Sequence, residues 1–289
     1  MAWKFDKAGK ASLVFAAAWV ALGVQADDGS RFSEGIGYYV GIDSRVTFPS
    51  GTYAGQVNPN VGRLSFLFDH GDHYHGIGTY SLSGPAGAPV VEPTNANNRI
   101  PELYSRTGGD TDAIRLLPGS GAFAGGWASA VLPEGTATHD YSHLGVASVQ
   151  SLNGLSPMAD VLFHSSGDRW SALYQNVSVG LKLVSATPGL KLAAGGMMDI
   201  FGGGNTFTLG ASDSFEFKPT YYVGAGAAAG VYTAQFQLVN LGSNLNARDG
   251  GNFYIDVSVP AIPEPGTWAM LAAGLLFVAV RARRAAASA

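Results

Sequence analysis

The stretch that decides the fold is residues 231–239, which read VYTAQFQLV. In this stretch Tyr232, Ala234, Phe236 and Leu238 alternate with polar residues. Because successive side chains of a strand point to opposite faces, the apolar residues share one face and the two glutamines lie on the other. The stretch therefore predicts a strand of an antiparallel sheet that buries one face only.

Similar short runs, rich in aromatic and β-branched residues, lie on both sides of this strand and are separated by turn-forming residues. The further predicted strands are residues 37–48, 62–68, 75–82, 145–152, 159–164, 177–184, 205–209, 214–217 and 252–259. The small-residue tracts 122–130 and 224–230 are expected to be loops. Many short strands and 40 glycines are typical of sandwiches and jelly rolls. The sequence thus predicts one all-β domain over residues 27–260, an antiparallel β-sandwich or jelly-roll-like fold.

The N-terminus has the three parts of a secretory signal peptide. Three lysines from Lys4 to Lys10 form a basic region, residues 11–24 are apolar, and Ala26 ends a small-residue cleavage site. Residues 1–26 are therefore expected to be a signal helix that is removed on export.

The C-terminus, residues 261–289, combines a proline-rich collar, an apolar run and a basic end. Residues 267–280 carry no charge, but this run is shorter than the roughly 20 residues of a stable membrane span. The residues of the collar and the basic end are Pro263, Glu264, Pro265, Arg281, Arg283 and Arg284. An extended collar before a short hydrophobic helix is accessible to a protease, because each proline disfavours helix at the preceding residue.

This order of collar, apolar run and arginines resembles the PEP-CTERM sorting tail. The resemblance implies recognition by an exosortase-type membrane enzyme and removal of the tail. The chain would be anchored transiently in the inner membrane, with its basic end cytoplasmic, and then delivered to the cell surface, the outer membrane or an extracellular matrix. The alternative is an ordinary C-terminal anchor, a transmembrane helix.

Charge and cysteine content restrict the partners of the part between the two ends. Residues 1–26 and 266–289 hold six of the 17 basic residues and one of the 21 acidic residues, so the remainder is strongly acidic. Such a surface repels phosphate backbones, and we expect no nucleic-acid partner. The chain has no cysteine, which excludes disulfides and thiolate metal sites.

The histidines are the feature that most indicates a binding site, because five of the six fall in two short windows. The windows are residues 69–75, which read DHGDHYH, and residues 139–143, which read HDYSH. Even spacing along a strand lets His73 and His75 share one face, and the same holds in the second window. The candidate metal ligands are His70, Asp72, His73, His75, His139, Asp140, His143 and His164.

Imidazole nitrogens suit Zn²⁺, Cu²⁺ and Ni²⁺, and nearby carboxylates can complete the shell or orient a ring. The predicted cofactor is Zn²⁺, with another divalent transition metal as the alternative. The pattern matches neither the His-Glu-x-x-His motif nor other hydrolase motifs. A cupin would require a glutamate shortly after the His73-x-His75 pair, and residues 76–84 contain none. No catalytic residue is predicted.

Three segments of the body, residues 68–78, 97–102 and 163–170, resemble a family of PEP-CTERM surface proteins controlled by the zinc-uptake repressor. The resemblance implies zinc binding or scavenging at the cell surface. The leading hypothesis is metal capture or buffering without turnover. One alternative is a structural or adhesive matrix protein that binds exopolysaccharide, with Trp127 and Trp170 as possible stacking rings, although a core position is expected for each. The other alternative is a zinc hydrolase.

Overall fold

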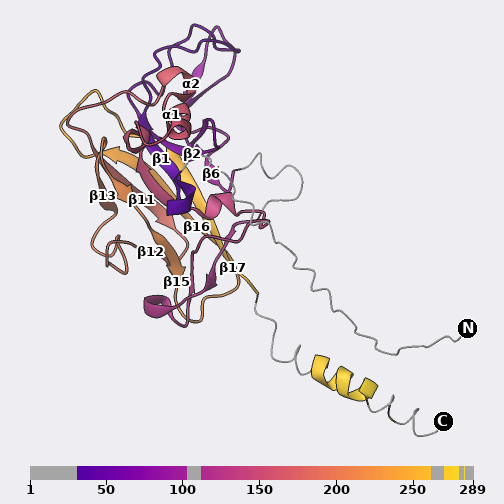
Figure 1. Ribbon diagram of the computed structural model, residues 1–289. Coiled ribbons are helices and arrows are strands. Elements are labelled where there is room, and N and C mark those ends of the chain that lie inside the picture. The colour runs from indigo at the N-terminus through magenta and orange to yellow at the C-terminus, as the bar shows by residue number, and fades with distance from the viewer. Residues whose placement is uncertain (1–30, 103–111, 262–269, 280–282, 284–289) are drawn as a thin grey trace, which may run out of the picture.

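The computed structural model describes residues 31–102, 112–261, 270–279 and 283 (Figure 1). The predicted signal helix lies outside these residues. The described body is built mainly of β-sheets with a few short helices, which confirms the all-β class.

The largest sheet has six strands and contains the strand from which the fold was predicted. Its order is β13-β11-β16-β17-β6, and β7 also pairs with β17. The strands are β6 (Arg99–Ile100), β7 (Ile114–Arg115), β11 (Ser178–Ala186), β13 (Thr206–Ala211), β16 (Gly230–Asn240) and β17 (Asn252–Val259). In β16, Ala234, Phe236 and Leu238 are buried while the glutamines between them are partly exposed. The predicted alternation is confirmed.

A five-stranded sheet packs against it, in the order β14-β10-β1-β2-β3. Its strands are β1 (Ile36–Ile42), β2 (Leu64–Asp69), β3 (Tyr74–Ile77), β10 (Gly145–Ser148) and β14 (Glu216–Phe217). Most neighbours are antiparallel, but β1 and β10 run parallel, as do β17 and β6. Aromatic rings fill the space between the two sheets; those of Phe66 and Phe253 stack with centroids 4.2 Å apart.

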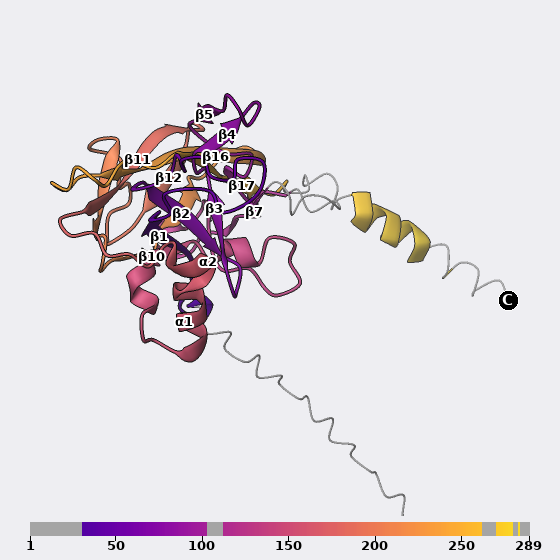
Figure 2. The same ribbon diagram turned by 90° about the horizontal axis from the view of Figure 1, so that it is seen from above.

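Strands β1 and β2 are buried on both faces because a second, smaller core lies behind them. This core joins Tyr39 and Leu67 to the helix α1 (Pro157–Phe163). Figure 2 shows α1 and the short α2 (Ser165–Asp168) on this outer side of the five-stranded sheet.

The prediction of a strand over residues 159–164 was wrong, because α1 contains residues 159–163 and His164 caps its C-terminal end. Ser156 caps this helix by accepting a hydrogen bond from the Ala159 amide, and a proline stands at its first turn. Ala159, Leu162 and Phe163, spaced three and four residues apart, bury one helical face. The strand predicted over residues 145–152 ends at Ser148 and continues as the 3₁₀ helix η5 (Val149–Leu152).

The remaining elements are short. A four-stranded sheet has the order β12-β15-β9-β8, and β4 and β5 form a separate hairpin. The bounds are β4 (Ser81–Ser83), β5 (Val90–Glu92), β8 (Leu117–Pro118), β9 (Trp127–Ala128), β12 (Leu190–Ala193), β15 (Thr220–Val223), η1 (Phe32–Glu34), η3 (Gly121–Phe123) and η4 (Asp140–Ser142). The predicted loop 122–130 therefore contains a strand and part of a 3₁₀ helix.

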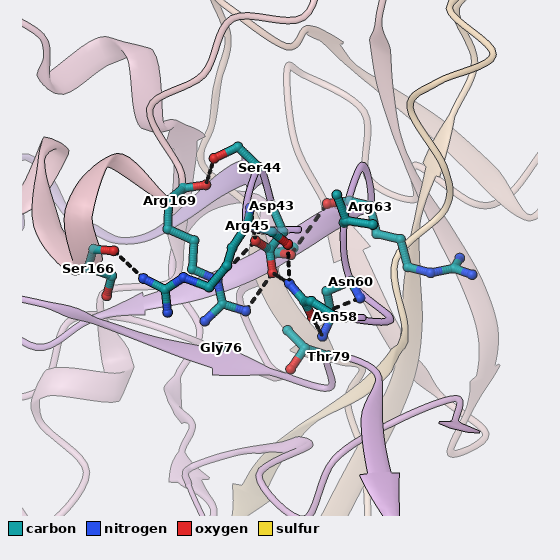
Figure 3. Close-up of polar contacts among 12 residues, drawn as sticks. Asp43, Ser44, Arg45, Asn58, Asn60, Arg63, Gly76, Thr79, Ser166 and Arg169 are labelled. Carbon is teal, nitrogen blue, oxygen red and sulfur yellow. Dashed lines mark hydrogen bonds and ion pairs between the residues drawn. The ribbon is translucent and has the colours of Figure 1, made fainter. Parts of the chain in front are cut away.

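A buried carboxylate ties the loop after β1 to the residues after α2 (Figure 3). Asp43, which is fully buried, accepts hydrogen bonds from Nε and Nη2 of Arg169 and from the Asn58 side-chain amide at 2.8 Å. In the same contact, Arg45 donates to the Ser166 carbonyl. This network links the sandwich to the smaller core.

Candidate metal centre

The first histidine window forms the turn between β2 and β3. The Asp69 side chain accepts a hydrogen bond from the Gly71 amide at 2.8 Å, and the His70 amide donates to the His73 carbonyl at 3.0 Å. Gly71 has φ of 88°, a conformation that other residues rarely adopt. The turn therefore folds back on itself and places two histidines beside His75, which belongs to β3.

The three rings of this turn gather their nitrogens. One donor atom each from His70, His73 and His75 lies within 4.8 Å of the others. The Nε2 atoms of His73 and His75 are 3.0 Å apart, and the ring centroids of His70 and His75 are 4.4 Å apart. Two nitrogens of a tetrahedral zinc site are about 3.4 Å apart, because each Zn–N bond is about 2.0–2.1 Å long. The observed spacing needs only a small adjustment to fit an ion.

Carboxylates hold the other nitrogen of two of these rings. The Nδ1 atom of His73 lies 2.6 Å from Asp72, and the Nδ1 atom of His75 lies 3.1 Å from both oxygens of Glu102. A carboxylate on the far nitrogen is the usual outer partner of a metal-bound imidazole, because it fixes the tautomer and the direction of the ring. Both rings are thus turned so that Nε2 faces the centre of the cluster.

Glu102 is fully buried and has further partners. The Asn97 side chain donates to Oε1 at 2.5 Å, and the Tyr141 hydroxyl donates to Oε2 at 3.3 Å. Burial raises the pKa of Glu102 to about 7. Burial, with a smaller contribution from the neighbouring imidazoles, lowers the pKa of His75 to about 4, so this ring is neutral at neutral pH, the state that binds a metal.

The cluster lies where the edges of the two large sheets meet. His75 is on β3, the last strand of the five-stranded sheet, and Glu102 follows β6, an edge strand of the six-stranded sheet. The Gly78 amide donates to the Asn97 carbonyl at 2.9 Å, which fixes the two segments side by side. His70 and His73 are exposed, while His75 is half-buried, so the centre opens to solvent.

The second histidine window lies at the 3₁₀ helix η4 and is not part of this donor group. The ring centroids of His139 and His143 are 5.1 Å apart. Nδ1 of His139 lies 3.0 Å from the Asp140 carboxylate, and Nδ1 of His143 lies 3.4 Å from the Asp140 carbonyl oxygen. His143 is buried, which lowers its pKa. This window reaches the cluster through Tyr141, the donor to Glu102, and its histidines have other contacts.

The last candidate, His164, lies elsewhere. It follows α1, its ring is exposed, and its Nδ1 contacts Asp168. Among the described residues the structure therefore brings together His70, His73 and His75 and leaves the other predicted histidines apart.

Sequence reasoning missed Glu102, Asn97 and Tyr141. Glu102 ends the polar segment 97–102, which contains many turn-forming side chains, and it stands 27 residues after His75. No spacing rule predicts a contact between His75 and Glu102, because that contact depends on how the two sheets pack against each other. A carboxylate at the end of a polar segment was the one available signal.

The tail is described only in part. Residues 270–279 are helical and Arg283 is exposed, whereas the other residues predicted for the collar and the basic end lie outside the described residues. In the part of the chain that the structure covers, no helix has both the length and the apolar character needed to cross a bilayer.

Comparison with known proteins identifies the tail. Residues 261–284 match the family model of the PEP-CTERM protein-sorting motif. This motif directs export and cell-surface sorting and is the recognition signal for exosortase processing. No curated protein and no solved structure was found to match the chain.

Proposed function

We propose that this exported protein binds a transition-metal ion, zinc in the first place, through His70, His73 and His75. The observation that supports this most directly is the pair of Nε2 atoms 3.0 Å apart, each in a ring whose Nδ1 contacts a carboxylate. Two imidazole nitrogens at this distance need a proton or a cation between them. A metal ion there would also reach the third ring.

The donor set favours zinc on chemical grounds. Zinc accepts imidazole nitrogen without any thiolate, and the chain has no cysteine. Three protein ligands would leave a fourth position for water. Since two of the three rings are exposed, the ion can enter and leave without a change of fold. Copper and nickel share this preference for imidazole and are alternatives for the test to separate.

The role we propose is capture or buffering of metal at the cell surface, without chemical turnover. The sorting motif supports the location. We further propose delivery to the outer membrane or the extracellular matrix after transient anchoring in the inner membrane.

Zinc titration of the purified exported protein, after removal of metal with a chelator, tests the proposal. Replacing His70, His73 or His75 by alanine is expected to weaken zinc binding by more than the 10–100-fold typical of losing an outer partner. His164→Ala is the matched control, because this exposed ring lies apart from the cluster. Equal zinc affinity in the wild type and in all three cluster variants would contradict the proposal.

Trp170, one of the two rings considered for stacking on a polysaccharide, is not exposed for that contact. Trp170 is buried in the smaller core and Arg169 covers its ring at 4.3 Å. Trp127 is half-buried against the main core. As expected from the sequence, both rings serve packing.

A further inference from the structure

Glu102 has the contacts of a residue that serves the metal centre without touching the metal. Its two oxygens lie 3.1 Å from Nδ1 of His75, on the opposite side of the ring from the Nε2 atom that faces His73. An ion bound between the two Nε2 atoms would therefore contact His75 on one side of its ring, and Glu102 would lie on the other side, out of contact with the ion. The donor group of three contains the histidines and not this carboxylate.

We propose that Glu102 is the positioning residue of this centre. Glu102 accepts a hydrogen bond from Nδ1–H of His75, so that the proton stays on Nδ1 and the lone pair on Nε2 points at the ion. This inference rests on the proposed function, and it adds to it the group that selects the metal-binding tautomer. An imidazole with its proton on Nε2 could not bind the ion through that atom.

The surroundings of Glu102 fit this role. A carboxylate without exposed surface can turn little, and donors from two separate segments, Asn97 and Tyr141, fix its oxygens. Tyr141 is itself held, because its ring stacks on Phe68 with centroids 4.8 Å apart and its carbonyl accepts from Tyr38 at 3.1 Å. The direction of the His75 ring is thus set by the core of the sandwich.

Asp72 makes a second contact of the same type. Asp72 holds Nδ1 of His73, but its side chain is exposed and adjacent in sequence, so it can move with the turn. Glu102 comes from the segment after β6 in the six-stranded sheet, and it is buried and fixed by two donors. Of the two carboxylates, Glu102 is therefore the one that connects the centre to the core of the fold.

The test is a double-mutant cycle on zinc affinity in the full exported protein. Glu102→Gln is expected to weaken zinc binding 10–100-fold, the effect typical of losing an outer carboxylate. In a His75→Ala background the same substitution is expected to have no further effect, whereas in a His70→Ala background it is expected to keep its full effect. A carboxylate that acts only by attracting the cation would weaken binding equally in both backgrounds, and that result would overturn the inference.

Glu102→Asp separates position from charge. It keeps the carboxylate but withdraws it by one methylene from Nδ1, and we expect it to weaken zinc binding as well. Wild-type affinity in this variant would show that charge is sufficient, contrary to the proposal. Unfolding measured in chelator shows whether each variant is folded before zinc is added.

Tyr141→Phe provides a second route if the Glu102 variants do not fold. It removes the hydroxyl that donates to Glu102, and a loss of zinc affinity of a few-fold is expected, again absent in the His75→Ala background. Unchanged affinity in Tyr141→Phe would then overturn the inference. If the wild type itself binds no zinc, the proposed function fails first; if it binds zinc and Glu102→Gln binds it equally, the inference alone fails.

Discussion

Asp72 and Glu102 each contact the Nδ1 atom of a histidine ring, but the Asp72 side chain is 78 % exposed and the Glu102 side chain is fully buried. Water screens and replaces an exposed contact, so it contributes little. We expect Asp72→Asn to weaken zinc binding by less than about tenfold, the lower end of the effect typical of outer carboxylates. Competition titration with a zinc chelator measures this. A loss as large as that of Glu102→Gln would mean that burial is not what distinguishes the two contacts.

His143 gives the metal-free protein a dependence on pH. Its ring is buried against Phe32, and burial lowers its pKa below the ordinary value of 6.5. The unfolded chain therefore takes up this proton first, so the stabilisation is complete above pH 6.5 and is lost as the pH falls below that value. His143→Asn, whose amide can still donate to the Asp140 carbonyl, should lose less stability between pH 8 and pH 5 than the wild type.

Urea unfolding at the two pH values, in the presence of a chelator, measures that difference. The other titrating groups are shared by both proteins and cancel in the comparison. Equal losses of stability in the two proteins would show that His143 is not a source of the pH dependence.

At the scale of elements, the pattern of β16 was predictable because each of its faces has one environment. The pattern of α1 was misread, since the short apolar run in residues 159–164 resembles a strand until the cap at Ser156 and the spacing of three and four are considered. The two-residue strand β9 carries no pattern of its own. It is defined by its pairing with β15 and β8. Gly126, just before it, approaches β15 so closely that an added Cβ would lie 2.4 Å from the Val223 carbonyl oxygen.

The cap of α1 can be tested directly. The Ser156 hydroxyl accepts a hydrogen bond from the Ala159 amide at 3.0 Å. Ser156→Ala should lower the free energy of unfolding by about 1 kcal/mol, because a helix amide loses its partner. Ser156→Asp is the matched control and should retain most of the stability, since aspartate caps equally well. Chemical denaturation compares the three proteins, and a loss in the aspartate variant equal to that in alanine would argue against capping.

At the scale of the whole molecule, the candidate site divides into a local part and a distant part. The sequence predicted the local part, because His73 in the turn and His75 on β3 are only two residues apart. Glu102 joins them only when the edges of two sheets meet at β3 and β6, and no local pattern specifies that meeting. The histidines of the second window were predicted as ligands from their clustering and even spacing, and the contact that the structure shows from this window to the cluster is that of Tyr141 with Glu102.

The same distinction between local and distant contacts applies to stability, and the ion pair of Asp43 and Arg169 is the clearest case. Asp43 follows β1 and has no exposed surface, whereas Arg169 follows α2. Arg169→Ala would leave a buried carboxylate without its counterion, and we expect it to lower the free energy of unfolding by about 3–5 kcal/mol. Thermal and urea unfolding should both show the loss.

Two variants make this expectation specific. Lys218→Ala breaks an ion pair with Glu216 in which both side chains are more than a third exposed, and it should cost less than about 1 kcal/mol. Asp43→Asn, added to Arg169→Ala, removes the stranded charge and should restore part of the lost stability, because the amide still fits the donor from Asn58. If the double variant is no more stable than Arg169→Ala, the cost arises from lost packing of the arginine on Trp170, and the buried charge is not its cause.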